Sequence, residues 1–285
     1  MLKFAYSTSV FRLRSLEDAI EGIERAGFTG VELIADRPHV FPDDMSAARV
    51  TELIRFLAQK KLQISNLNSA LVTTAYGEQK SPSWIAEDAD EREKRIRYTL
   101  SCLRMAAAMG IPHVSTDTGP GFISESLSLF EALDLYVGQM SRILPVAKKL
   151  SVHLLLQPEP DSLVQGTEDV LDMMRRLRNH EYVGINFDAG HFYCVGEDPC
   201  DAYEALRKYV YHVSLADMPL NQSHRHIQLG DGGMDISRFL NCLMASNYLG
   251  YVTIKLDSHD QRADKVAMAS AQYLRERDFM PSVRE

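Results

Sequence analysis

Several side chains that can carry acid–base or electrostatic chemistry follow apolar runs of this chain. Asp188 follows such a run in NFDAGH, Gln157 and Glu159 in HLLLQPEP, and Lys255 in YVTIKLD. A carboxylate can exchange a proton with carbon and an ammonium can stabilise an oxyanion, so the set suits proton transfer next to a carbonyl group. We therefore take Lys255, Asp188, Gln157 and Glu159 as candidate catalytic residues.

Other polar residues follow the same kind of run and form a second group of candidates. A single His or Asp in a loop is more often structural or solvated than functional. Here, polar residues recur after successive apolar runs, which is how a polar pocket is built on a packed core. The candidate substrate-binding residues are Glu32, Arg37, His39, His191, Ser214, His224 and His226.

The elements that must position these residues alternate between strand and helix along the whole chain. Apolar spacing predicts strands at 3–7, 30–34, 62–66, 113–116, 152–156, 182–187, 210–215 and 251–256. Amphipathic helices are predicted between them, including 46–59, 88–109, 127–150 and 235–247. The pattern predicts an α/β fold, a single (β/α)8 TIM barrel with eight parallel strands, as one domain over residues 1–285. An open doubly wound sheet is the alternative.

In such a barrel, active sites lie at the C-terminal ends of the strands and in the loops that follow them. The segment 68–87 is long and has few periodic apolar residues. We expect it to be a loop over the active-site face, with Tyr76 and Trp84 lining the pocket. The alternative is a surface excursion packed by one tryptophan.

Composition excludes several classes of function. The chain is 45% hydrophobic and 25% charged, and no apolar run approaches the roughly 20 residues that a membrane span needs. The first residues lack the pattern of a secretory signal, so we expect a cytoplasmic protein. A net charge of −8 opposes binding to nucleic acid. The four cysteines are scattered without a CxxC pair, which indicates neither a zinc knot nor a disulfide framework.

Five segments resemble the xylose isomerase-like TIM barrels, which include sugar phosphate isomerases and epimerases, inosose-processing enzymes and the family 2 AP endonucleases. The resemblance runs over nearly the full length. Its carriers are AGFTGVELIADRPHVF, LLLQPEP, NFDAGHFYCVGEDP, YHVSLAD with HRHIQLGDGGMD, and GYVTIKLD. These segments are specific for the superfamily but identify no substrate.

The resemblance implies a divalent metal bound by Glu, Asp, His and Glu after strands five to eight. The matching residues here are Gln157, Asp188, Ser214 and Lys255, so three of the four positions carry unsuitable groups. We expect a degenerate site with no metal and no other cofactor. The negative charge of Asp188 and the positive charge of Lys255 cancel without a cation, and we predict an ion pair between them. We expect Gln157 and Ser214 to form hydrogen bonds to this pair or to a ligand.

A two-residue shift in the alignment gives a different ligand set. Glu159, Asp188, His212 and Asp257 would then bind Mn, Co or Zn. Residues two apart on a strand share a face, so the shift stays open. Pro158 nevertheless indicates that the strand ends before Glu159.

Three functions remain open. The first is an isomerase, epimerase or related lyase that acts on a small polyhydroxylated carbonyl compound, such as a sugar, sugar derivative or cyclitol, without the metal of the family. Lys255 would then stabilise an oxyanion, act as a base or form a Schiff base. The second is a metal-dependent epimerase with the shifted ligands. The third is a noncatalytic sugar-binding homologue. The partner is a sugar-like small molecule in each case, and the resemblance also implies a possible homo-oligomer.

Overall fold

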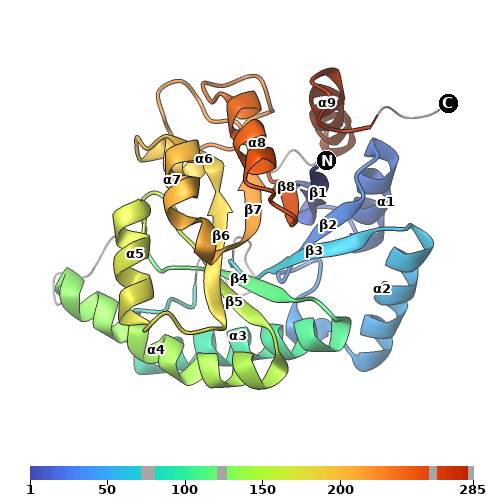
Figure 1. Ribbon diagram of the computed structural model, residues 1–285. Helices are drawn as coiled ribbons and strands as arrows, with labels where there is room; N and C mark the ends of the chain where they lie inside the picture. Colours follow the sequence, from blue (N-terminus) through green and yellow to red (C-terminus); the bar gives the residue numbers. More distant parts are fainter. Residues whose placement is uncertain (72–80, 121–126, 257–261, 282–285) are drawn as a thin grey trace.

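Eight parallel strands close into a barrel in the order β1 to β8, with β8 paired to β1 (Figure 1). The computed structural model describes residues 1–71, 81–120, 127–256 and 262–281. The predicted (β/α)8 TIM barrel is confirmed. The strands are β1 Lys3–Ser7, β2 Gly30–Ile34, β3 Gln63–Asn68, β4 His113–Asp117, β5 His153–Gln157, β6 Val183–Asp188, β7 Val210–Leu215 and β8 Tyr251–Ile254.

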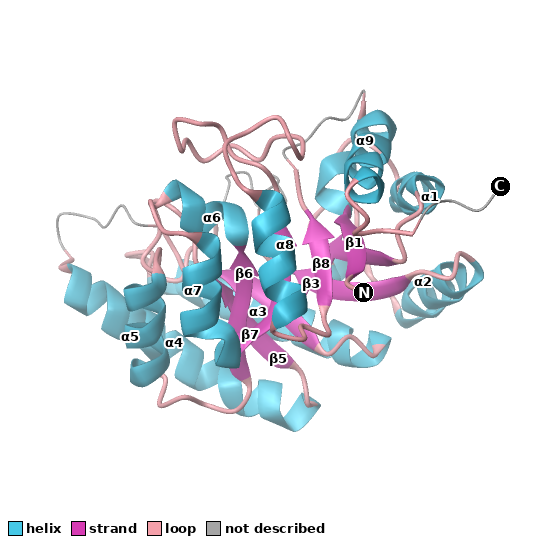
Figure 2. Cartoon of the chain, turned by 45° about the horizontal axis from the view of Figure 1, so that its top comes forward, coloured by secondary structure: helices cyan, strands magenta, loops and turns pink. Residues whose placement is uncertain are grey.

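The helices surround the barrel and cover its outer face (Figure 2). None among the described residues is both long and apolar enough to cross a membrane. The α-helices are α1 Leu16–Ala26, α2 Ala47–Gln59, α3 Ala89–Met109, α4 Leu129–Leu150, α5 Thr167–Arg176, α6 Ala189–Cys194, α7 Pro199–Leu206, α8 Ile236–Ala245 and α9 Ala263–Glu276. The short 3-10 helices are η1 Thr8–Phe11, η2 Pro42–Asp44 and η3 Arg207–Tyr209.

Local sequence signals explain where these helices begin and end. Ser128 and Glu131 form a reciprocal capping box at the start of α4. Gly110 ends α3 in the left-handed conformation, with φ of 71°, which a side chain would disfavour. The helices therefore return the chain to the start of each strand, and every strand ends at the same face of the barrel.

Part of the segment 68–87, which was predicted to be a loop over the active-site face, is buried. Trp84 is fully buried, packs edge-on against Tyr136 of α4 and lies 4.8 Å from the guanidinium of Arg95. Arg95 is itself buried and donates to Asp117 at 2.6 Å. Trp84 is thus a packing residue. Residues 72–80, which include Tyr76, lie outside the described residues.

Candidate active site at the barrel mouth

The centre of the barrel holds a buried polar network instead of the usual apolar filling. On one side of this network, Asn186 of β6 bonds to three other side chains. Its amide nitrogen donates to Gln157 at 2.9 Å, and its amide oxygen contacts the Ser214 hydroxyl at 3.1 Å and His212 Nδ1 at 2.8 Å. His212 Nε2 lies 2.8 Å from Thr253 Oγ1. Gln157 and Ser214 therefore bond to Asn186, whereas the sequence predicted that they bond to an ion pair of Asp188 and Lys255 or to a ligand.

A second part of the network surrounds Glu32. Its carboxylate accepts from Ser7 at 2.9 Å, from Asn66 at 2.8 Å and from Asn68 at 3.4 Å. The Asn66 oxygen lies 3.3 Å from His113 Nδ1, and the His113 and His212 rings are 5.6 Å apart. The Glu32 charge is therefore satisfied inside the protein.

Three histidines converge at the mouth, above this network. His191 of α6 and His224 and His226 of the β7–α8 connection place one ring nitrogen each within 4.8 Å of the others. The Nε2 atom of His191 lies 3.0 Å from Nε2 of His226 and 3.0 Å from Nε2 of His224. We call these three residues the histidine triad. The β7–α8 connection that carries two of them is drawn in orange in Figure 1.

Backbone carbonyls fix the orientation of two triad rings. His191 Nδ1 lies 2.8 Å from the Pro158 oxygen, and His226 Nδ1 lies 2.8 Å from the Lys255 oxygen. A carbonyl only accepts, so each Nδ1 carries the proton and each neutral ring turns an Nε2 lone pair toward the other. Two lone pairs at 3.0 Å repel unless a cation or a proton lies between them. Burial lowers the pKa of His191 well below its usual value, which disfavours a proton there.

Asp188 lies at the junction of β6 and α6, beside the triad. Its Oδ1 accepts from the Gly190 N–H at 3.1 Å. Its Oδ2 has no hydrogen-bond partner among the described residues and lies 3.6 Å from His191 Nε2. Burial opposes ionisation of Asp188, but the nearby histidines and Lys255 outweigh it and lower its pKa to about 2. The group is thus a buried carboxylate with one free oxygen.

The predicted ion pair between Asp188 and Lys255 does not form. Among the described ion pairs, the partner within 4.0 Å of Asp188 is His191. The reason is local: the first turn of α6 holds Asp188 Oδ1 at its own backbone, and Oδ2 faces the triad. Lys255 stands just after β8, partly exposed, with its backbone bonded to Leu215 and His226.

The remaining candidates lie apart from one another. Arg37 forms an exposed salt bridge with Asp44 at 2.7 Å and lies over the Phe41 ring. His39 is buried after β2. Glu159 is buried on the loop after β5, one residue beyond the carbonyl that holds His191. Asn186, which connects Gln157, Ser214 and His212, was not among the candidates.

In the shifted ligand set, His212 is bonded to other side chains. His212 uses both ring nitrogens in the polar network, which leaves neither for a metal. Asp257 lies outside the described residues. The histidines that do converge are the triad, each of which the sequence placed among the substrate-binding candidates.

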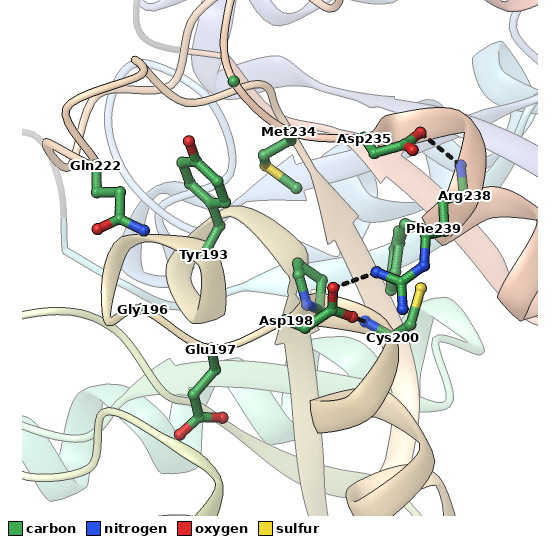
Figure 3. A pocket seen from close by; sticks show the side chains of 12 residues that line it. Tyr193, Gly196, Glu197, Asp198, Cys200, Gln222, Met234, Asp235, Arg238 and Phe239 are labelled. Carbon is green, nitrogen blue, oxygen red and sulfur yellow. Dashed lines mark hydrogen bonds and ion pairs between the residues drawn. The ribbon is translucent and has the colours of Figure 1, made fainter.

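A separate pocket of about 360 Å³ opens between α6, α7 and α8 (Figure 3). Tyr193 and Met234 line one part of it, and Asp198, paired with Arg238, lines another. No triad residue lines this pocket, and neither does Asp188 or Lys255. The candidate chemistry therefore lies at the barrel mouth and not in this pocket.

Comparisons with known proteins agree with this fold. A family model described as xylose isomerase-like TIM barrel matches residues 20–277. An inosose dehydratase of Clostridium perfringens is 26% identical over 159 residues, which is 48% of this chain and 52% of that protein. One from Clostridium botulinum is 22% identical and covers 92% of this chain and 90% of its own length. The chain thus spans about half the length of the first of these inosose dehydratases and nearly all of the second.

Two solved structures share the fold at low identity. A D-tagatose 3-epimerase-like protein superposes with a TM-score of 0.79 and 20% identity and covers 97% of both chains. An IOLI protein with a bound zinc atom superposes with a TM-score of 0.76 and 14% identity, over 99% of this chain and 100% of that one.

Proposed function

Because the chain belongs to the xylose isomerase-like TIM-barrel family, we propose that it moves a proton on the carbon next to the carbonyl of a small polyhydroxylated compound. A sugar, sugar derivative or cyclitol is the class of substrate. The observation that carries the proposal is a buried carboxylate, Asp188, with a free oxygen beside three converged imidazoles and Lys255 at the barrel mouth.

The residues at the four metal positions of the family do not fit a divalent cation. Gln157 and Ser214 are engaged with Asn186, and Lys255 repels a cation. Only Asp188 offers a suitable ligand atom. We therefore derive no step through a metal at that place.

The histidine triad does fit a transition metal. Two tautomers are fixed by carbonyls, as the outer hydrogen bonds of metal-bound histidines usually are. In a tetrahedral zinc site with bonds of about 2.0 to 2.1 Å, ligand nitrogens are roughly 3.3 Å apart, close to the 3.0 Å of the two triad pairs. We propose that the triad holds one divalent ion, which would supply a Lewis acid for a substrate oxygen.

The roles of the protein side chains follow from their charge and basicity. Its neighbours lower the pKa of Asp188, so we assign it the role of the fixed negative charge beside the triad. Glu159, the buried carboxylate after β5, is the proton carrier. Lys255 stabilises the oxyanion, a role that needs no change in its protonation.

Hydrogen exchange tests the reaction. The protein is incubated in D₂O with D-fructose, D-fructose 6-phosphate and 2-keto-myo-inositol, and loss of the proton next to the carbonyl is followed by NMR. We expect exchange in at least one compound. The exchange rate should fall about 100-fold or more in Glu159→Gln and in Lys255→Met. It should not change in Glu168→Gln, because Glu168 is an exposed residue of α5. Unchanged turnover in Lys255→Met would refute the oxyanion role.

Metal analysis tests the triad independently of turnover. Protein stripped with a chelator is reloaded with Zn²⁺ and desalted, and its metal content is measured. We expect about one ion per chain, lost in His226→Ala and retained in His180→Ala, whose ring lies in the α5–β6 connection. If the wild type and His226→Ala retain equal amounts of zinc, the histidine triad is not the zinc site.

A further inference from the structure

The ammonium of Lys255 forms no close ion pair with the described residues. Its backbone N–H donates to Leu215 at 3.1 Å and its carbonyl accepts from His226 at 2.8 Å, which fixes its position beside the triad. Its side chain is partly exposed, and no carboxylate among the described residues lies within 4.0 Å of its ammonium. The charge is therefore available to a ligand.

Three carboxylates among the described residues of the barrel interior and mouth face other groups. Asp217 accepts four backbone N–H groups, from Met218, Gly230, Gly232 and Met234, at 2.9 to 3.1 Å. Glu32 accepts from three side chains on the opposite side of the barrel. Asp188 faces the triad.

The balance of charge at the mouth also differs from that implied by the family pattern. Three carboxylates and a histidine with their bound dication carry a formal charge of −1, whereas Gln157, Asp188, Ser214 and Lys255 sum to zero without a metal. The neighbouring triad adds no negative charge, and a divalent ion there would add two positive ones. The mouth is therefore more favourable to an anion than the family ligand set would be.

We propose that the substrate carries an anionic group, a carboxylate or a phosphate, next to its reacting carbons, and that Lys255 binds it. This inference rests on the proposed function and names its substrate class. A lysine ammonium has three N–H donors, so it can hold an oxygen of the anion together with the neighbouring carbonyl oxygen. A neutral sugar or cyclitol has no charged group that could form an ion pair with this ammonium.

Equilibrium binding tests the proposal without turnover. Calorimetry compares D-gluconate, D-glucitol 6-phosphate and neutral D-glucitol, each with the zinc-loaded protein. We expect at least one anion to bind 10-fold or more tightly than glucitol, and the better of the two distinguishes a carboxylate from a phosphate. In Lys255→Met, the preference should fall about 10- to 100-fold, the usual strength of a hydrogen bond to a charged group.

Two variants complete the experiment. Lys255→Arg should retain most of the preference, and Lys208→Met, at an exposed lysine of η3, should retain all of it. Equal or absent binding of the three probes would overturn the proposal, as would an anion preference that persists in Lys255→Met. Because no proton transfer is measured, these outcomes are separate from a failure of the hydrogen-exchange experiment.

Discussion

His113 and His212 lie inside the barrel, where burial lowers the pKa of each ring to about 3. In the unfolded chain the same rings titrate near 6.5, so below that pH the unfolded state binds more protons than the folded state. Stability contributed by the neutral rings is present above pH 6.5 and is lost as the pH falls. We expect the free energy of unfolding to drop by about 1.5 kcal/mol per ring between pH 6.5 and 5.

Urea denaturation of the wild type and of His212→Gln at both pH values measures this effect. The variant is expected to be less stable overall, because His212 bonds to Asn186 and Thr253. The informative quantity is the decrease in the free energy of unfolding between pH 6.5 and 5. In His212→Gln this decrease should be smaller than in the wild type by about the contribution of one histidine ring. An identical pH dependence in both proteins would contradict the buried, neutral state of His212.

Individual site residues could be predicted from the sequence only where a charged or ring side chain follows an apolar strand. This rule selected Asp188, His191 and Lys255. It missed Asn186, because a mid-strand amide has no distinctive signal and a register irregularity between Ile185 and Asn186 alters the pairing of β6 with β7. Hydrogen-bond partners depend on such local geometry.

The β7–α8 connection is the element that presents two triad histidines, and Asp217 organises it. Besides its four carboxylate bonds, Asp217 pairs with Ile227 through two backbone hydrogen bonds. A Cβ on Gly232 would lie 2.3 Å from the Asp217 carboxylate, so the turn closes tightly around that group. We expect Asp217→Asn, which turns an acceptor into a donor facing N–H groups, to weaken zinc binding 10-fold or more.

Competition with a fluorescent zinc indicator measures the affinity, and limited proteolysis reports on the connection itself. Asp231→Asn is the matched control, because Asp231 is exposed in the same connection and its backbone N–H donates to the Gln228 oxygen. Wild-type zinc affinity in Asp217→Asn would show that the connection keeps its shape without this carboxylate.

Elements with strong periodicity were predicted closely. The strand predicted at 210–215 is β7, and the helix predicted at 88–109 differs from α3 only by its capping residue Asp88. Helix α6 was not predicted, because six residues are fewer than two turns and carry no usable apolar period. That short helix places His191.

For the whole molecule, alternation of strands and helices was enough to predict the closed barrel, since one core can be built from it only in a few ways. The alternation of strands and helices could not predict that the three histidines of the triad meet. His191 lies 33 and 35 residues from its partners, and their meeting depends on how the β6–α6 and β7–α8 segments pack over the barrel.

The thermal stability of the whole barrel should increase when a metal ion occupies the triad. The triad joins segments that follow two different strands, so an ion held there binds the folded chain and not the unfolded one. At a zinc concentration 100 times the dissociation constant, the folded state gains about 2.7 kcal/mol, which corresponds to a rise of roughly 4 to 5 °C in Tm for a chain of this length. Thermal unfolding with Zn²⁺ and then with excess chelator measures this shift. It should vanish in His226→Ala and persist in His180→Ala, and a rise of equal size in His226→Ala would place the stabilising ion elsewhere on the chain.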